Sequence, residues 1–98
     1  MTGIERIAAE RKRQIAQEGW TPENDNKYVD SQLVRAAVCY ALPRENRTGI
    51  WTILWPWGAG FWKPSPDNRI RELEKAGALI AAEIDRLQRI DSFKSEKV

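Results

Sequence analysis

The sequence predicts an all-α fold: a compact three-helix domain with an irregular segment, rich in tryptophan and proline, between the second and third helices. Three observations support this prediction. Apolar residues recur at helical spacing near both ends of the 98-residue chain. Residues 50–66 hold four of the five tryptophans and three of the five prolines. Proline lacks a backbone donor and restricts the preceding residue, so this segment does not form one continuous helix.

The first helix is predicted over residues 3–18. Thr2 and Glu5 have the spacing of a capping box, and Gly19 suits the position that follows a helix end. The expected buried stripe consists of Ile4, Ile7, Ala8 and Ile15. Arg11 lies on this stripe, where a hydrophobic residue is expected. It either reaches over the edge of the core towards a carboxylate or faces a pocket.

The second helix is predicted over residues 31–42, with Asp30 or Ser31 as its N-cap and Pro43 after its end. Its inward positions are mostly small and leave volume that tryptophan rings can fill. They are Leu33, Ala36, Ala37, Tyr40 and Ala41. Cys39 on the same helix is interpreted as a small buried hydrophobic residue and not as a nucleophile.

Three other stretches are predicted to lack long helices. Residues 20–30 form a polar loop in which Thr21 can cap one helical turn that begins at Pro22. Residues 43–49 form a solvated loop. Residues 50–54 are predicted to be irregular, because a lone strand would have no partner to pair with.

The third helix is predicted from Ser65, as N-cap, and Pro66, in the first turn, to about residue 91. Its apolar residues alternate at spacings of three and four, as in a coiled coil. They are Ile70, Leu73, Gly77, Ile80, Ile84 and Leu87. Gly77 predicts a close neighbour, with a tryptophan ring expected there. Because this seam suits a dimer interface, we expect a homo-oligomer formed through this helix.

The whole chain is expected to form a single domain over residues 1–91, followed by a frayed tail over residues 92–98. A net charge of +2, from 16 basic and 14 acidic residues, is too balanced for a dedicated DNA binder. The absence of histidine and the single cysteine argue against a zinc site and exclude histidine-based catalytic triads. No membrane span or signal peptide is recognised, so we expect a cytoplasmic protein.

Catalysis is not supported by any motif. No carboxylate pair has a spacing that demands a metal ion or an acid–base role. The glycines at positions 58 and 60 lack the lysine and the helix start of a phosphate-binding loop. We therefore predict that the protein is not an enzyme and has neither a cofactor nor a metal site.

Several motifs occur in order between residues 4 and 90. They are Arg11-x-x-Gln14-Ile15-x-x-Glu18-Gly19-Trp20-Thr21, Ala36-Ala37-x-x-Tyr40-Ala41, Trp55-Pro56-Trp57, Trp62-Lys63-Pro64 and Lys75-Ala76-Gly77-Ala78-Leu79-Ile80-x-Ala82-Glu83-Ile84. Together they resemble a family of small bacteriophage and prophage proteins with no assigned biochemical role. The resemblance implies a phage origin and action inside a bacterial host cell. The chain departs from the family at residues 24–26, where relatives often carry a histidine followed by two acids.

Gly19 and Trp20, followed by an aromatic and proline-rich segment and a closing helix, also resemble the ryanodine-receptor repeat domain. Tryptophan faces stack on nucleobases with about 1–3 kcal/mol each, and nearby arginine or lysine can hold phosphate groups. The candidate ligand-binding residues are Arg11, Trp20, Arg35, Tyr40, Trp57, Trp62 and Lys63. The tryptophans can equally form the core, since each buries about 150–250 Å². Both interpretations hold if one or two rings line a pocket.

The leading functional hypothesis is a phage-encoded protein that binds a nucleotide-like small molecule. It would sequester a nucleotide immune signal of the host and so act in counter-defence. One alternative is an inhibitor that binds a host defence protein directly, in the manner of an anti-CRISPR protein. Another is a nucleic-acid-binding accessory protein. A ligand binder gains thermal stability with nucleotides, whereas the affinity of a nucleic-acid binder falls steeply with salt.

Overall fold

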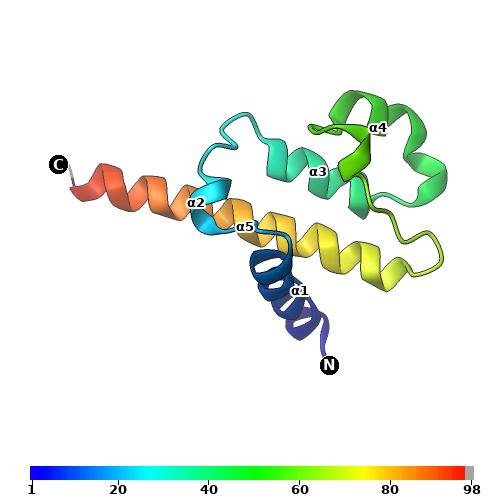
Figure 1. Ribbon diagram of the computed structural model, residues 1–98, viewed down its shortest axis with the longest axis horizontal. Coiled ribbons are helices and arrows are strands. Elements are labelled where there is room, and N and C mark those ends of the chain that lie inside the picture. Colours follow the sequence, from blue (N-terminus) through cyan, green and yellow to red (C-terminus); the bar gives the residue numbers. More distant parts are fainter. Residues whose placement is uncertain (97–98) are drawn as a thin grey trace.

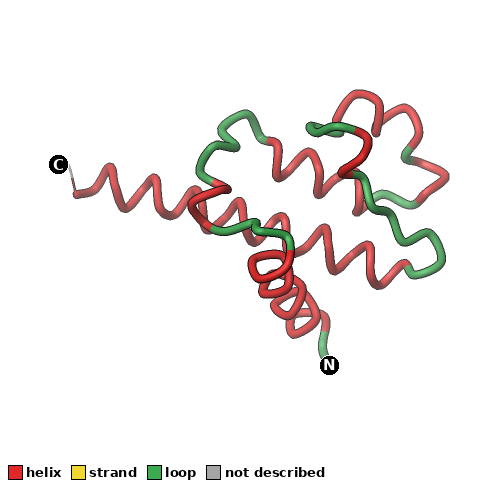
Figure 2. Tube along the Cα trace, viewed as in Figure 1, coloured by secondary structure: helices red, strands yellow, loops and turns green. Residues whose placement is uncertain are grey.

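The computed structural model describes the backbone of residues 1–96 and the side chains of residues 1–92, and every regular element in this part of the chain is helical (Figure 1, Figure 2). The α-helices are α1 (Gly3–Gln17), α2 (Pro22–Asp25), α3 (Gln32–Ala41), α4 (Thr48–Leu54) and α5 (Arg69–Glu96). Two short 3₁₀ turns are η1 (Arg44–Asn46) and η2 (Ala59–Phe61). The all-α prediction is confirmed, but the described chain has five α-helices and not three.

The long helix α5 is the element on which the others are assembled. It packs against α1, α2 and α3, and α3 in turn contacts α4. Figure 1 shows α3 and α4 on one side of α5, while α1 crosses it on the other side and the last turns of α5 extend past the rest. Within the described residues, no helix is both long enough and apolar enough to span a bilayer.

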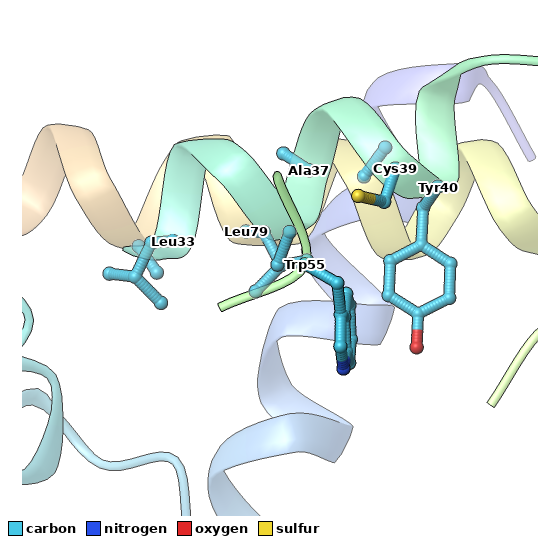
Figure 3. Packing of buried hydrophobic residues seen from close by; sticks show 9 residues of the cluster. Leu33, Ala37, Cys39, Tyr40, Trp55 and Leu79 are labelled. Atoms are coloured by element: carbon cyan, nitrogen blue, oxygen red, sulfur yellow. The ribbon is translucent and has the colours of Figure 1, made fainter. Parts of the chain in front are cut away.

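The core lies between α3 and α5 and is built from small residues, two leucines and two aromatic rings (Figure 3). Its buried members are Leu33, Ala36, Ala37, Cys39, Tyr40, Trp55, Ala76, Leu79 and Ala82. The predicted inward face of the second helix is therefore confirmed, with Ala41 half-buried. Cys39 is fully buried, as predicted. Small side chains let the two helices approach closely and leave room for the indole of Trp55.

The predicted irregular segment contains a helix that the sequence did not reveal. Residues 50–54, predicted to be irregular, form most of α4, which ends where Trp55 turns into extended backbone. From there to Asn68 the chain is irregular except for η2. The indole Nε1 of Trp55 donates to the carbonyl of Gly58 at 3.1 Å and fixes the first bend. The Trp51 ring of α4 stacks on the Trp55 ring, and this contact stabilises the helical conformation of residues 50–54.

At α1, the ends are as predicted but the buried face is not. Thr2 and Glu5 form the capping box, and Gly19 adopts a φ of +71°. The predicted apolar stripe is wrong at Ile4, which is 82% exposed, and at Ala8, which is also exposed, whereas Ile7 and Ile15 are half-buried. The buried residues are Glu10, Arg11 and Gln14. They are buried because α1 turns its charged side towards partners on α5 and α2, where Glu10 accepts from Arg71 and Arg11 donates to Asp25.

At α5, both ends differ from the prediction. The helix begins at Arg69 and not at Pro66, because the Asn68 N–H bonds to the Ser65 carbonyl at 2.9 Å and makes a turn before the helix. The side chain of Asn68 then accepts from the N–H of Arg71 at 3.0 Å. The predicted frayed tail, 92–98, begins inside this helix, which continues to Glu96, and residues 97 and 98 lie outside the described residues.

The close neighbour predicted at Gly77 exists, but it is not a tryptophan. A methyl group added at Gly77 would lie 2.5 Å from Cδ1 and 2.7 Å from Cγ1 of Ile7. The glycine therefore lets α1 cross closely over α5.

We expect Gly77→Ala to lower the melting temperature, since overpacking costs about 1–3 kcal/mol and the gain in helix propensity is only about 1 kcal/mol. In an Ile7→Ala background the same substitution should raise the melting temperature, because the clash is gone. Thermal unfolding of the four proteins measures this coupling. A Gly77→Ala effect of the same sign and size in both backgrounds would contradict the assigned contact.

Candidate functional site

The five tryptophans form one connected aromatic cluster around Trp62. Its ring stacks on Tyr40 with centroids 4.6 Å apart and meets the ring of Trp55 edge-on at 4.9 Å. The guanidinium of Arg47 lies 5.3 Å from the same ring. Trp57 extends the cluster to Trp20 at 5.6 Å. The cluster holds the irregular segment against α3 and leaves a hollow on each of two sides.

We call the first of these the cationic hollow; it has a volume of about 160 Å³. It lies where α1, the end of α3, the turn η2 and α5 meet. Its lining residues are Glu10, Arg13, Gln14, Glu18, Trp20, Tyr40, Phe61, Lys63 and Lys75. Residues that are distant in the sequence therefore combine three cations, two carboxylates and three aromatic rings in one place.

The two lysines of the cationic hollow are fixed in different ways. Lys75 donates from Nζ to the carbonyl of Lys63 at 2.6 Å and lies 5.6 Å from the centroid of the Tyr40 ring. Burial and the neighbouring charge of Arg71 lower the pKa of Lys75. Lys63 is largely exposed, and its Nζ lies 3.6 Å from a carboxylate oxygen of Glu18. Both ammonium groups would therefore gain from an added anion.

The carboxylates of the hollow are already neutralised by arginines. Glu10 is buried and accepts two hydrogen bonds from Arg13, at 2.8 and 2.9 Å, and one from Arg71 at 2.6 Å. Burial raises the pKa of Glu10, but the hydrogen bonds and charges of Arg13 and Arg71 outweigh it and hold the pKa below its usual value. Arg13 also donates to Glu18 at 3.1 Å. The hollow thus keeps a positive surplus near Lys63 and Lys75.

The aromatic walls of the hollow differ in exposure. Tyr40 is buried, and its hydroxyl accepts from the N–H of Lys63 at 3.2 Å, which fixes the lysine backbone. Phe61, on η2, is 64% exposed, although it has a large apolar ring. Trp20 is half-buried and rests against Trp57. The hollow therefore offers flat apolar surfaces beside ammonium groups, an arrangement suited to a planar ring that carries a negative group.

The second hollow lies on the other side of Trp62, and we call it the α4 groove. It has a volume of about 340 Å³ and is lined by Arg44, Arg47, Thr48, Trp51, Thr52, Trp62, Pro64 and Pro66. Arg47 lines the groove, but its guanidinium is already engaged by paired hydrogen bonds to Glu72, at 3.0 and 3.1 Å. The α4 groove therefore presents one unengaged cation, Arg44, among the described residues that line it.

The seven predicted ligand-binding residues do not share one site. Trp20, Tyr40 and Lys63 line the cationic hollow, whereas Trp62 lines the α4 groove. The remaining three, Arg11, Arg35 and Trp57, line neither hollow and make contacts within the fold.

Arg11 is buried and donates to Asp25 at 2.9 Å and to the carbonyl of Trp20 at 3.2 Å, so it pairs with a carboxylate and does not line either hollow. Arg35 donates from Nε to the carbonyl of Leu54 at 3.1 Å and closes the end of α4. Trp57 packs among other rings of the aromatic cluster. Of the two interpretations of Arg11, the structure therefore agrees with the one in which it pairs with a carboxylate, and not with the one in which it faces a pocket.

Six lining residues of the cationic hollow were not predicted to be ligand-binding from the sequence: Glu10, Arg13, Gln14, Glu18, Phe61 and Lys75. The exposure of Phe61 could have been predicted from the sequence, since a phenylalanine between Gly60 and Trp62 on a short irregular segment has few ways to be buried. The positions of Arg13 and Lys75 in the hollow could not have been predicted, because each resembles an ordinary surface cation until the crossing of α1 and α5 is known. Among the described residues, no group of three or more acidic or cysteine side chains could hold a metal ion.

The comparisons with known proteins add no assignment to this geometry. Neither the protein-family models, nor the curated proteins, nor the solved structures gave a match to the chain. The resemblance to small phage proteins and that to the ryanodine-receptor repeat domain therefore stay predictions from the sequence.

Proposed function

We propose that the protein binds a small anionic ligand with a planar ring, of the nucleotide class, in the cationic hollow. The observation that carries the proposal is an exposed ring in a hollow that has three cations and two carboxylates. Phe61 keeps most of its surface open, and Lys63, whose Nζ lies 3.6 Å from a carboxylate oxygen of Glu18, lines the same hollow. The carboxylates of the same hollow are already bonded to Arg13 and Arg71.

The size of the hollow supports partial enclosure of the ligand. Its volume of about 160 Å³ is below the roughly 300–1,000 Å³ typical of pockets that enclose a drug-sized molecule. A phosphate group fits beside Lys63 and Lys75, while the attached base stacks on Phe61 and Trp20 at the rim. Each stacked face contributes about 1–3 kcal/mol.

The biological setting comes from the sequence resemblance alone. If the chain is a phage protein, a binder of this kind would sequester a nucleotide immune signal of the host cell and so prevent the defence response. Binding without catalysis suffices for this role, because a ligand held tightly no longer reaches its receptor.

Thermal unfolding with a panel of linear and cyclic nucleotides tests the proposal. A ligand at 100 times its Kd stabilises by about 2.7 kcal/mol, which corresponds to a shift of roughly 10–20 °C for a domain of this size. We expect Lys63→Glu and Phe61→Ala to remove most of the shift. Lys12→Glu, a charge reversal at an exposed position of α1 outside the hollow, should leave it unchanged.

Absence of any shift across the panel would exclude the proposal. An equal loss of the shift in melting temperature in Lys12→Glu and Lys63→Glu would show that the overall charge of the protein, and not the hollow, attracts the ligand.

Direct inhibition of a host defence protein is the second candidate function, and the exposed apolar residues of α5 favour it. That function requires stable co-purification with one host protein and no response to nucleotides.

A further inference from the structure

The residues that line the cationic hollow carry a surplus of one positive charge. The charged members are three cations and two carboxylates: Arg13, Lys63, Lys75, Glu10 and Glu18. One more cation, Arg71, bonds to Glu10 from outside the lining. Its charge is shared with Glu74, which lies 3.2 Å from the same nitrogen. Arg71 therefore does not enlarge the surplus inside the hollow.

This surplus is located on Lys75. Among the described residues, the salt bridges within the lining join Arg13 and Lys63 to the two carboxylates, and none involves Lys75. Its Nζ donates to two neutral oxygens instead, the carbonyl of Lys63 at 2.6 Å and the hydroxyl of Ser65 at 3.4 Å. An ammonium group has three N–H donors, so one remains for a ligand.

The surroundings of Lys75 make an added anion favourable. Burial is the largest cause that lowers its pKa, the charge of Arg71 lowers the pKa further, and the carboxylates of Glu10 and Glu72 do not outweigh them. A nearby negative charge stabilises an ammonium group that burial destabilises. One anionic group beside Lys75 would therefore balance the charge of the hollow.

The two carboxylates set an upper limit to the charge of the ligand. Glu10 is buried, and Glu18 is bonded to Arg13 and lies 3.6 Å from Nζ of Lys63. The hollow has a volume of only about 160 Å³, so a second phosphoryl group inside it would lie close to one of these carboxylates. Like charges placed together weaken binding, and no further unpaired cation of the lining is present to offset them.

We infer that the cationic hollow selects a ligand with a single negative charge, which Lys75 holds, and that Glu10 and Glu18 disfavour ligands with more. This inference rests on the function proposed above and narrows its ligand class. A phosphate monoester carries about 1.5–2 negative charges at pH 7, and di- and triphosphates carry more. A phosphate diester carries one. The ligand is therefore a phosphodiester, as in a cyclic nucleotide or in the linkage between two nucleosides.

A series of ligands that differ mainly in charge tests the inference. Its members are adenosine, the methyl ester of adenosine 5′-phosphate, adenosine 5′-phosphate and adenosine 5′-diphosphate, and the corresponding compounds of guanosine, cytidine and uridine cover the other bases. Isothermal titration calorimetry at pH 7 and constant ionic strength measures each Kd. We expect the methyl ester to bind about tenfold more tightly than the nucleoside, and also more tightly than the 5′-phosphate and the 5′-diphosphate.

Two variants should change the preferred charge in opposite directions. Glu18→Gln removes one carboxylate of the lining, so the ratio of the Kd values should move about tenfold towards the 5′-phosphate. Lys75→Gln removes the unpaired cation but keeps a donor for the carbonyl of Lys63. It should reduce the advantage of the methyl ester over the nucleoside to less than about twofold. Far-ultraviolet circular dichroism and the melting temperature without ligand check that both variants fold.

Glu45→Gln is the matched control for Glu18→Gln. It makes the same change in the total charge, but Glu45 is exposed on η1 and lines neither hollow, so the ratio of Kd values should keep its wild-type value. A ratio that moves equally in both variants would overturn the inference, since the overall charge of the chain would then set the preference.

The inference and the proposed function fail in different ways. If the 5′-phosphate or the 5′-diphosphate binds as tightly as the methyl ester, or more tightly, the selection of a single charge is wrong, while a nucleotide still binds and the proposed function stands. If no compound of the four series binds, the proposed function fails and the inference fails with it.

Discussion

Glu72→Gln is expected to lower the free energy of unfolding by about 3–5 kcal/mol, the range measured when one partner of a buried ion pair is removed. The carboxylate of Glu72 accepts from both terminal nitrogens of Arg47, at 3.0 and 3.1 Å, and from the N–H of Ser65 at 3.2 Å. Glutamine keeps one acceptor oxygen but leaves the buried charge of Arg47 unpaired. Domains have only about 5–15 kcal/mol of stability in total, so this loss is a large fraction.

The pH dependence gives a second measurement of the same interaction. Burial raises the pKa of Glu72, but Arg47, Ser65 and Arg69 together outweigh it and hold the pKa below its usual 4.5. A carboxylate with a lowered folded pKa stabilises the fold above its unfolded pKa, and this contribution is lost as the pH falls through the folded pKa. Wild-type stability should therefore decline as the pH falls below about 4.5, and Glu72→Gln should decline less steeply.

Urea unfolding at pH 7 measures the main effect. Asp67→Asn is the control, because Asp67 is exposed and outside the Glu72 network, and it should change stability by less than about 0.5 kcal/mol. A loss below about 1 kcal/mol in Glu72→Gln would contradict the view that this carboxylate joins α5, α4 and the irregular segment.

Arg11→Met should have the next largest effect, also about 3–5 kcal/mol at pH 7, because it removes the ion-pair partner of the fully buried carboxylate of Asp25. Burial already raises the pKa of Asp25 despite Arg11. An acid with a raised folded pKa favours folding most below its unfolded pKa, and this contribution is lost as the pH rises through the folded pKa. The variant should therefore recover part of its deficit relative to wild type at pH 5.

Urea unfolding of wild type and variant at pH 7 and pH 5 measures this recovery. Arg6→Met is the matched control, since Arg6 pairs with Glu74 at 3.4 Å near the surface and should contribute less than about 1 kcal/mol. An equal effect of both substitutions, or a deficit of Arg11→Met that grows towards pH 5, would contradict the assigned role of Asp25.

Features set by neighbouring residues could be predicted from the sequence. The Thr2–Glu5 capping box and the helical turn at Pro22 depend on contacts within a few residues, and the inward face of α3 follows from the helical spacing of its apolar residues. Each of these features contains residue types that are typical of that local structure and of few others. The sequence therefore predicted these elements to within one or two residues.

Features set by distant contacts could not be predicted. The spacing of apolar residues on α5 predicted the seam, but not which face meets the core, because the buried face consists of alanines, Leu79 and charged residues that are paired within α5 or with other segments. The start of α4 is tied to Arg47, whose partner Glu72 is 25 residues away. The lining of the cationic hollow was predicted only in part, since Arg13 and Lys75 join it through the crossing of α1 and α5.

The central claim is that the cationic hollow, and not the α4 groove, receives the ligand. The five indole N–H signals in a two-dimensional ¹H–¹⁵N nuclear magnetic resonance spectrum can report this directly, once Trp20→Phe and Trp51→Phe assign the two that matter. At a saturating concentration of a nucleotide that raises the melting temperature, we predict a shift of the Trp20 signal and none of the Trp51 signal. A shift of Trp51 with Trp20 unmoved would contradict the claim.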